Sequence, residues 1–391
     1  MNKKNYTCGI DIGSSFTKVV VLGYEKGGKD LTLLASSYVE TRGVRLGYIT
    51  NVDHVAGTVK KAISSVENVL GFKIKNAYIS IEGINLSSVV SIGSSIISKA
   101  DQEITELDVH KAIDNSEENL DTPNKKIIHT IPLSYKIDGK DIFGHPESMK
   151  GIKLEVRTLF ITCLKQNVED IITVFGLLNI NILDIIASPI ASSNILLSTK
   201  QKTAGCALLD IGCETVSLTV FEENSPIYLI TFPFGSMDIT KDIALGFKIS
   251  LEEADSIKHG NVIGADYSKK KIDEIIEARL VDIFELVNNH LKKLKRNELL
   301  PAGIIITGGG ALINKIEEIA KRELKLPASV GTVDQQTNNK LKIKDSSWYT
   351  AYGLALSSKE NFDNQNIYNS LGVDVKQVKG FFKSIFSQLL P

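Results

Sequence analysis

Apolar and polar residues follow two periods that alternate along this chain. Up to about Ser37 the pattern indicates strands joined by tight turns, and residues 53–70 then place apolar side chains at helical spacing. Residues 76–82 return to a strand pattern. Further helical spacing occurs at 166–178, 236–246, 251–259 and 271–295, with hairpin strands at 205–229 and a strand followed by a helix at 303–324. This alternation predicts an α/β fold.

The stretch from about residue 83 to residue 162 has a different pattern. It contains β-branched runs, one helical segment from Thr105 to about Leu120, and a strand pair around residues 126–137. We interpret it as an α+β subdomain inserted into the α/β fold.

One short motif ends two of the predicted strands. Asp11 closes an apolar run and Gly13 stands two residues later, and Asp210 and Gly212 repeat this arrangement about half a chain further on. Glycine lets the backbone approach phosphate oxygens, N–H groups and hydroxyls donate to them, and the carboxylates suit a hydrated Mg²⁺. An ordinary hairpin turn is the alternative for either copy. Two copies in similar strand contexts favour a nucleotide site between facing hairpins.

A glycine-rich turn adds a third element to this predicted site. Residues 304–313 form an apolar strand, the turn Gly308-Gly309-Gly310, and the beginning of a helix. Such a turn brings backbone and a helix N-terminus close to a ligand. We predict that it contacts the nucleoside and the α-phosphate.

Composition limits the class of protein. A chain of 391 residues is suited to two or three domains, and 23% charged with 43% hydrophobic residues is typical of a globular protein in water. The net charge of −1 gives no electrostatic argument for nucleic acid. There is neither a signal-peptide pattern nor a run of about 18 apolar residues that could span a bilayer. We expect free thiols in a reducing cytoplasm, because no metal-ligand spacing links the four cysteines, Cys8, Cys163, Cys206 and Cys213.

The C-terminus combines a polar linker with an amphipathic pattern. Residues 357–366 are polar, and the apolar side chains that follow recur at helical spacing with lysines beside them. The predicted helix is too short to cross a bilayer but suits the membrane interface. Docking on the chain's own core and insertion into a groove of another protein are the alternatives. The residues predicted to meet lipid are Val378, Phe381, Phe382, Lys383, Ile385, Phe386 and Leu389.

These features together resemble one family. Two phosphate hairpins and a glycine-rich turn in this order look like the actin/Hsp70/sugar-kinase fold, and within it the chain resembles bacterial FtsA, the actin-like cell division protein. The segments that carry the match are residues 131–139, 146–155, 234–244 and 253–260, together with the linker and the C-terminal helix. The resemblance covers essentially the whole chain.

The resemblance implies a two-lobed actin-like, ribonuclease H-like fold. Residues 1–82 would form subdomain 1A, to which the chain returns near 345–357, and residues 83–163 would form the inserted subdomain 1C. Subdomain 2A would comprise 164–236 and 301–344, and the helical subdomain 2B residues 237–300. A flexible linker (358–376) and a membrane-binding helix (377–391) would follow.

The resemblance also implies roles for individual residues around ATP and Mg²⁺. Asp11 and Asp210 match the acidic residues near the metal, and Asp210 would take part in any catalysis. Asp255 and Lys258 fall where the superfamily contacts ribose and adenine. Glu169 is a candidate for orienting water, with an ordinary surface role as the alternative. The phosphate and nucleoside contacts would come from Gly13, Ser14, Ser15, Lys18, Gly212, Thr215, Gly308, Gly309 and Gly310.

The second hairpin departs from the family pattern. Cys213 and Glu214 stand where glycines are usual, and a carboxylate pointing at phosphate would be strongly repelled in a site of low dielectric. We therefore expect Glu214 to point away from the ligand. The change leaves ATP binding in place and predicts weak or no ATPase activity.

The resemblance implies that the chain tethers FtsZ filaments to the cytoplasmic face of the bacterial plasma membrane at the division site. It would bind FtsZ through residues 237–300, polymerise with itself, bind anionic lipid, and meet other division proteins through the inserted subdomain. A pilus-assembly type of actin-like ATPase and a metabolite kinase of the same fold are the alternatives. A fragment of an Hsp70-like chaperone fits less well, because the chain has the insertion and lacks a β-rich substrate domain.

Overall fold

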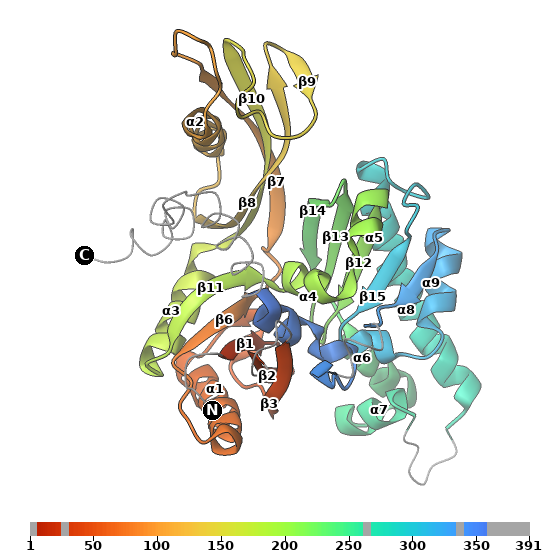
Figure 1. Ribbon diagram of the computed structural model, residues 1–391. Helices are drawn as coiled ribbons and strands as arrows, with labels where there is room; N and C mark the ends of the chain where they lie inside the picture. Colours follow the sequence, from red (N-terminus) through yellow and green to blue (C-terminus); the bar gives the residue numbers. More distant parts are fainter. Residues whose placement is uncertain (1–5, 25–30, 261–266, 334–339, 358–391) are drawn as a thin grey trace.

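The computed structural model describes residues 6–24, 31–260, 267–333 and 340–357. These residues form two large β-sheets that stand side by side, each with helices packed on it, a short two-stranded sheet, and a third unit that projects from one end (Figure 1). The predicted C-terminal helix lies outside the described residues.

The first lobe is built on a five-stranded sheet in the order β11-β6-β1-β2-β3. β1 pairs with β2 in antiparallel fashion and with β6 in parallel, and β6 pairs in parallel with β11. Apolar residues of α1 and α3 share one core with β1 and β6. The elements are β1 (Tyr6–Ile12), β2 (Phe16–Tyr24), β3 (Leu31–Glu40), β4 (Val44–Arg45), β5 (Tyr48–Ile49), α1 (Val52–Leu70), β6 (Asn76–Ile81), α3 (Lys165–Leu177), β11 (Asn181–Ala187) and α4 (Ser188–Leu196).

The predicted helix at 53–70 is confirmed as α1, and its ends explain its bounds. The Asn51 side chain accepts a hydrogen bond from the His54 N–H, which caps the N-terminus. Gly71 ends the helix with φ at 72°, a conformation that glycine adopts without steric cost.

The second lobe contains a nine-stranded sheet whose first five strands are in the order β16-β15-β12-β13-β14. β12 pairs with β13 in antiparallel fashion and with β15 in parallel, and β15 pairs in parallel with β16. The elements are α5 (Thr199–Ala204), β12 (Cys206–Ile211), β13 (Val216–Glu222), β14 (Ser225–Phe232), α6 (Ser236–Phe247), α7 (Leu251–Lys258), α8 (Lys269–Lys293), β15 (Ile304–Thr307), η1 (Gly309–Leu312), α9 (Ile316–Leu324) and β16 (Ala328–Val330).

The two lobes therefore repeat one strand arrangement. β1 and β2 of the first lobe correspond to β12 and β13 of the second, and β6 corresponds to β15. The predicted α/β class and two-lobed arrangement are confirmed. One boundary is wrong, because α3 and β11 belong to the first lobe although residues from 164 onward were expected in subdomain 2A.

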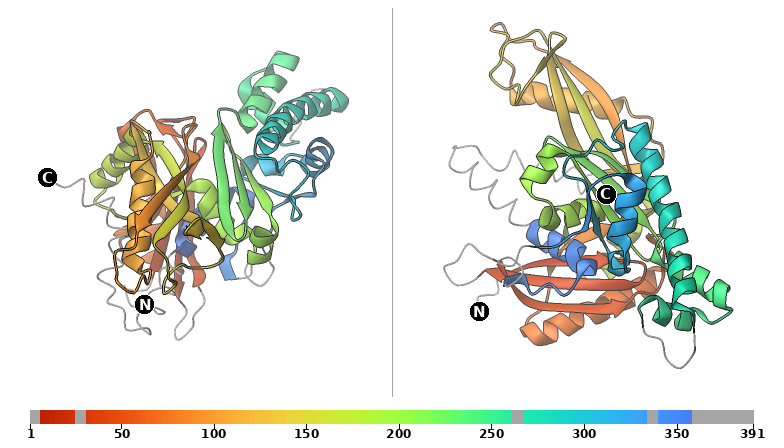
Figure 2. Two further views of the ribbon diagram at one scale, coloured as in Figure 1. Left: turned by 90° about the horizontal axis from the view of Figure 1, so that it is seen from above. Right: turned by 90° about the vertical axis from the view of Figure 1, so that its right-hand side faces the viewer.

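The inserted subdomain extends the second sheet. Its strands follow β14 in the order β7-β10-β8-β9, and β7 meets β14 where Ser87 pairs with Ile230. In Figure 1 and in the right-hand view of Figure 2 it projects beyond both lobes. The elements, which confirm the expected α+β insertion, are β7 (Ser87–Ile96), α2 (Glu106–Glu118), β8 (Lys125–Ile137), β9 (Lys140–Ile142) and β10 (Lys153–Leu164).

The chain returns to the first lobe after β16. η2 (Ser346–Trp348) leads into a helical segment at 349–357, and Trp348 and Tyr352 are buried against Val20 and Leu22 of β2. Close packing leaves no room for a side chain at Gly9, where a Cβ would lie 2.3 Å from the Ala351 carbonyl oxygen. This return places η2 beside the carboxyl end of β15, since Ser346 donates to the Gly308 carbonyl at 2.8 Å.

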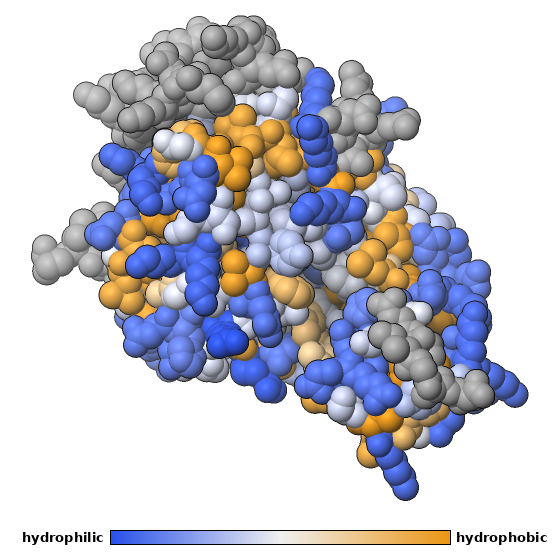
Figure 3. Space-filling model, turned by 90° about the horizontal axis from the view of Figure 1, so that it is seen from below, coloured by the Kyte–Doolittle hydropathy of each residue, from blue (hydrophilic) through white to orange (hydrophobic). Residues whose placement is uncertain are grey.

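On the face seen from below in Figure 3, apolar side chains form several separate patches among charged ones. In the part of the chain that the structure describes, none of the helices has the length and apolar character needed to cross a membrane.

Candidate nucleotide site

The two Asp-x-Gly motifs form hairpins with the same backbone geometry. The Gly13 N–H donates to the Phe16 carbonyl at 3.2 Å, and the Gly212 N–H donates to the Thr215 carbonyl at 2.8 Å. In each loop four residues separate the last paired residues of the two strands, Ile12 with Thr17 and Ile211 with Val216. Lys18 stands opposite Asp11 in the first hairpin, whereas Ser217 stands opposite Asp210 in the second. The repeated motif therefore gives two matching loops, one per lobe, and only the loop of the first lobe has a lysine opposite its aspartate.

The tips of both hairpins line a single cleft of about 380 Å³. The η2 segment and the N-terminal residues of α6 line it as well. The structure brings together twelve of the predicted nucleotide-site residues there: Asp11, Gly13, Ser14, Ser15, Lys18, Asp210, Gly212, Thr215, Asp255, Lys258, Gly308 and Gly309.

The two hairpin carboxylates of this cleft, Asp11 and Asp210, form no ion pair among the described residues. Ser80 at the end of β6 donates to Asp11 Oδ1 at 2.9 Å. Burial, and secondarily the nearby Asp11 carboxylate, raise the pKa of Asp210 to about 7. Burial also raises the pKa of Asp11, although Lys18 and the hydrogen bond from Ser80 act to lower it. Burying carboxylates near each other is unfavourable, so this arrangement suits a cation between them.

The donor set fits a magnesium ion that keeps water and phosphate ligands. Within the described ranges, no group of three or more His, Cys, Asp or Glu side chains is placed to hold a metal. Asp11 and Asp210 would then be the protein carboxylates near the ion, and Mg²⁺ is commonly bound through one or two carboxylates plus phosphates.

The hairpin loops fit a bound anion. The Ser14 hydroxyl is buried at the cleft and has no hydrogen-bond partner among the described residues. A buried hydroxyl without a partner costs free energy, which a phosphate oxygen would recover. Lys18 donates to the Ser347 carbonyl at 2.5 Å and so holds its ammonium group inside the cleft.

Lys258 provides the second cation of the cleft. Its ammonium group lies 2.7 Å from Asp255 Oδ1 and 2.7 Å from the Thr240 hydroxyl, and the side chain is only 7% exposed. Helix α7 thus carries a paired Asp and Lys at the cleft wall, with Thr240 of α6 beside them, where the family resemblance placed Asp255 and Lys258.

Two predicted site residues do not line the cleft. Glu169 lies on α3 with a 39% exposed side chain, 3.5 Å from Lys165, because the apolar residues of that helix turn its opposite face to the core. The water-orienting role expected for Glu169 is therefore not supported by its position. Gly310 is buried, and a Cβ there would lie 2.3 Å from the Ile211 side chain, so this glycine serves close packing of η1 on β12.

Sequence reasoning missed Glu82. This residue directly follows β6, lines the cleft, and accepts a hydrogen bond from the Thr215 hydroxyl of the second hairpin. Burial, with further contributions from Asp11, Asp210 and Glu214, raises its pKa to about 8, although the Thr215 hydrogen bond opposes the shift. The available signal was a lone acidic residue at the end of an apolar strand.

Glu214 points away from the cleft, which confirms the expectation. Its Oε2 accepts from the Leu46 N–H at 2.7 Å, and its Oε1 lies 3.0 Å from Arg45 Nε. Cys213 instead lines the cleft and hydrogen-bonds with the Ser15 side chain of the first hairpin. Of the four cysteines only Cys213 is partly exposed, while the other three are buried.

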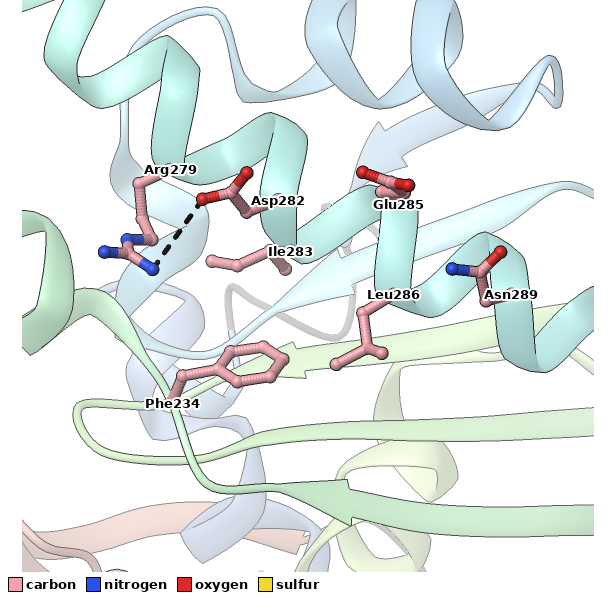
Figure 4. A pocket seen from close by; sticks show the side chains of 7 residues that line it. All are labelled: Phe234, Arg279, Asp282, Ile283, Glu285, Leu286 and Asn289. Atoms are coloured by element: carbon pink, nitrogen blue, oxygen red, sulfur yellow. Dashed lines mark ion pairs between the residues drawn. The ribbon is translucent and has the colours of Figure 1, made fainter.

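A separate pocket of about 320 Å³ lies on α8 (Figure 4). Phe234, Ile283 and Leu286 give it apolar walls, and Arg279 stands at one end, where it makes two hydrogen bonds to Asp242 at 2.7 and 3.0 Å. Asp282, Glu285 and Asn289 complete the lining.

Solved structures of similar shape support the actin-like fold. The chain superposes on a protein of the "PilM-PilN type IV pilus biogenesis complex" with a TM-score of 0.67 and 16% identity, covering 90% of this chain and 98% of that one. It superposes on MreB 5 of Spiroplasma citri bound to AMPPNP with a TM-score of 0.54 and 13% identity, covering 93% and 99%.

Sequence comparisons identify the family. The chain is 28% identical to cell division protein FtsA of Bacillus subtilis (strain 168) over 375 residues, which cover 90% of this chain and 83% of the relative. It is also 28% identical to FtsA of Neisseria meningitidis serogroup B over 378 residues, which cover 90% of each. The model "Cell division protein FtsA" matches residues 207–353, and "SHS2 domain inserted in FTSA" matches residues 80–162. Because these two models together match more than half of the chain, in the second lobe and in the insertion, the chain belongs to the FtsA family of cell division proteins.

Proposed function

We propose that this protein binds ATP with Mg²⁺ in the cleft between its lobes and acts as a nucleotide-controlled membrane tether for FtsZ. The observation that carries the ATP proposal is the pair of matching hairpins at one cleft, one of which presents the Ser14 hydroxyl, for which the described part of the chain offers no hydrogen-bond partner. Asp11 and Asp210 would lie near the metal, and Lys258 with Asp255 near the nucleoside. When bound, the metal would neutralise phosphate and carboxylate charge.

The position of Cys213 gives a direct test of ATP binding. A maleimide should label Cys213 in the nucleotide-free protein, since the other cysteines are buried. Saturating MgATP should slow this labelling about tenfold or more, and the Asp210→Ala variant should lose the protection. Equal labelling rates with and without MgATP, together with no heat of binding in titration calorimetry, would contradict the proposal.

Nucleotide would act through the relative position of the lobes. A ligand that contacts hairpins from both lobes binds the closed arrangement more tightly, and it shifts the equilibrium only by that difference in affinity. We propose that closure favours self-assembly into filaments, as the family resemblance implies, and that hydrolysis is slow.

We assign the FtsZ contact to the helical region 237–300, and within it to the pocket on α8. Its apolar walls and the fixed guanidinium of Arg279 suit a short segment that offers an apolar side chain beside a carboxylate. The Leu286→Asp variant should lose co-sedimentation with FtsZ filaments. Lys292→Gln, an equal change in charge at an exposed position of the same helix, should retain it.

The tether proposal requires the membrane, the partner and the nucleotide in one assay. FtsZ filaments should co-sediment with anionic vesicles only when this protein is present, and more strongly with ATP. The protein would then act at the cytoplasmic face of the plasma membrane at the division site. Other division proteins would bind through the inserted subdomain. Filaments that stay in the supernatant with vesicles and ATP present would contradict the tether.

A further inference from the structure

Glu82 stands at the centre of the cleft, where the two lobes meet. β6 pairs in parallel with β1, so its carboxyl end points to the same edge as the first hairpin. Ser80 reaches Asp11 from this strand, and Glu82 follows two residues later. In the second lobe, Thr307 at the end of β15 pairs with Asp210 and is the counterpart of Ser80. Gly309 follows Thr307 by two residues and is therefore the counterpart of Glu82. The first lobe thus presents a carboxyl group where the second has no side chain.

The backbone around Glu82 is fixed from two sides. The Asn167 side chain donates to the Glu82 carbonyl at 2.8 Å, and the Ser188 hydroxyl donates to the Ile81 carbonyl at 3.1 Å. The Thr215 hydroxyl then holds one oxygen of the carboxyl group. This support orients the side chain into the cleft without closing it off, since Glu82 lines the cleft.

A purely structural role does not account for this carboxyl group. Glu82 forms no ion pair among the described residues, and Asp11 and Asp210 oppose its ionisation. A neutral side chain would accept the Thr215 hydrogen bond at lower cost, because burying a charge near like charges is unfavourable. Carboxyl groups whose ionised form is disfavoured by burial and by neighbouring carboxylates are characteristic of sites that transfer protons.

We propose that Glu82 accepts the proton of the water molecule that attacks the terminal phosphoryl group of a bound nucleoside triphosphate. This inference rests on the proposed ATP binding. The water oxygen forms a bond to the γ-phosphorus, and the bond from that phosphorus to the β–γ bridging oxygen breaks. Its electron pair leaves with the diphosphate. The proton of the water passes to the Glu82 carboxylate and from there to solvent.

The surroundings of Glu82 give this step a pH dependence of definite sign. Asp11, Asp210 and Glu214 disfavour the ionised form, and Lys18 across the hairpin favours it. With a pKa of about 8, Glu82 is mostly protonated at neutral pH and cannot accept a proton. Hydrolysis should therefore be slow at pH 7 and rise as the pH approaches and passes 8. The charges of the bound nucleotide and metal would change the pH at which the hydrolysis rate is half-maximal, but the rate would still increase with pH.

The test compares Glu82→Gln with Glu169→Gln, a matched change on the exposed face of α3. Glutamine keeps an acceptor for Thr215 but cannot take a proton. Glu82→Gln should bind MgATP within about threefold of the unsubstituted protein in titration calorimetry. Its single-turnover hydrolysis should be about 100-fold slower and independent of pH. Glu169→Gln should change neither quantity.

A second measurement needs no turnover. In the nucleotide-free protein, infrared difference spectra should show a protonated carboxyl band that titrates near pH 8 and is absent in Glu82→Gln. The inference is overturned if MgATP binds but Glu82→Gln hydrolyses it at the unsubstituted rate, if bound MgATP is not hydrolysed between about pH 6 and 9, or if the band is missing. If MgATP does not bind the unsubstituted protein, the proposed function itself fails.

Discussion

The carboxylate of Glu214 accepts a hydrogen bond from the backbone N–H of Leu46 at 2.7 Å. Glu214 lies at the tip of the second hairpin, and Leu46 lies between β4 and β5 of the first lobe. The contact therefore joins the two lobes beside the phosphate loops. Thr215, the next residue, reaches back to Glu82 of the first lobe. The residues that replace the family's usual glycines are thus used to connect the lobes.

Replacing Glu214 with Ala should weaken this connection. The Leu46 N–H loses its acceptor, which costs about 0.5–1.5 kcal/mol of unfolding free energy. Urea denaturation would measure the loss, and small-angle scattering should show a larger radius of gyration. Arg45→Ala is the matched control. Its side chain is 68% exposed, so the ion pair contributes little and the effect should stay within about 0.5 kcal/mol. Equal effects of the two substitutions would contradict the role assigned to the backbone hydrogen bond.

Gly308 and Gly309 should respond differently to the same substitution. Gly308 has φ at 84°, and a Cβ there would lie 2.3 Å from Asp210 Oδ1 and 2.5 Å from the Ile211 carbonyl oxygen. Gly308→Ala should therefore cost about 1–3 kcal/mol of stability and displace Asp210. A Cβ on Gly309 meets nothing within 4 Å, so Gly309→Ala should change stability by less than about 0.5 kcal/mol. Thermal unfolding of both variants checks this, and comparable losses would show that the turn is not held by close packing.

The sequence was sufficient to predict features that depend on local order. Both phosphate hairpins, the glycine turn and α1 follow from residues close together in the chain, and all are found as expected. Glu82 could not be predicted in this way. Its place depends on the parallel pairing of β6 with β1, which joins residues about 70 positions apart, and an acidic residue at the end of an apolar strand does not by itself indicate that pairing.

The misplacement of Glu169 and that of β11 have the same kind of cause. Glu169 was chosen for its position at the start of a helix, but the packing of Val168, Ile171 and Phe175 decides which face of α3 is buried. β11 is an apolar strand that could join either sheet by its own sequence. Pairing with β6 places it in the first lobe, which a sequence pattern does not specify.

The stability of the nucleotide-free protein should fall as the pH rises from about 4 to 8. Asp210 and Glu82 have pKa values raised by burial, to about 7 and about 8, from ordinary values of 3.8 and 4.5. Between those limits the folded protein holds protons that the unfolded chain has released, so unfolding free energy decreases with pH. Asp210→Asn should flatten this dependence in urea titrations at several pH values. Asp141→Asn, at an exposed position, should leave it unchanged, and parallel curves for all three proteins would contradict the assignment.

Membrane attachment should depend on the C-terminal segment, which lies outside the described residues. Its predicted apolar face carries Phe381, Phe382 and Phe386, and a charge on that face opposes burial among lipid chains. Phe382→Glu, or deletion of residues 378–391, should release the protein from anionic vesicles in a sedimentation assay. The matched control is Phe143→Glu in the inserted subdomain, where the side chain is 95% exposed. This variant should sediment with vesicles like the unsubstituted protein. Vesicle binding that survives the deletion would place the lipid contact elsewhere on the molecule.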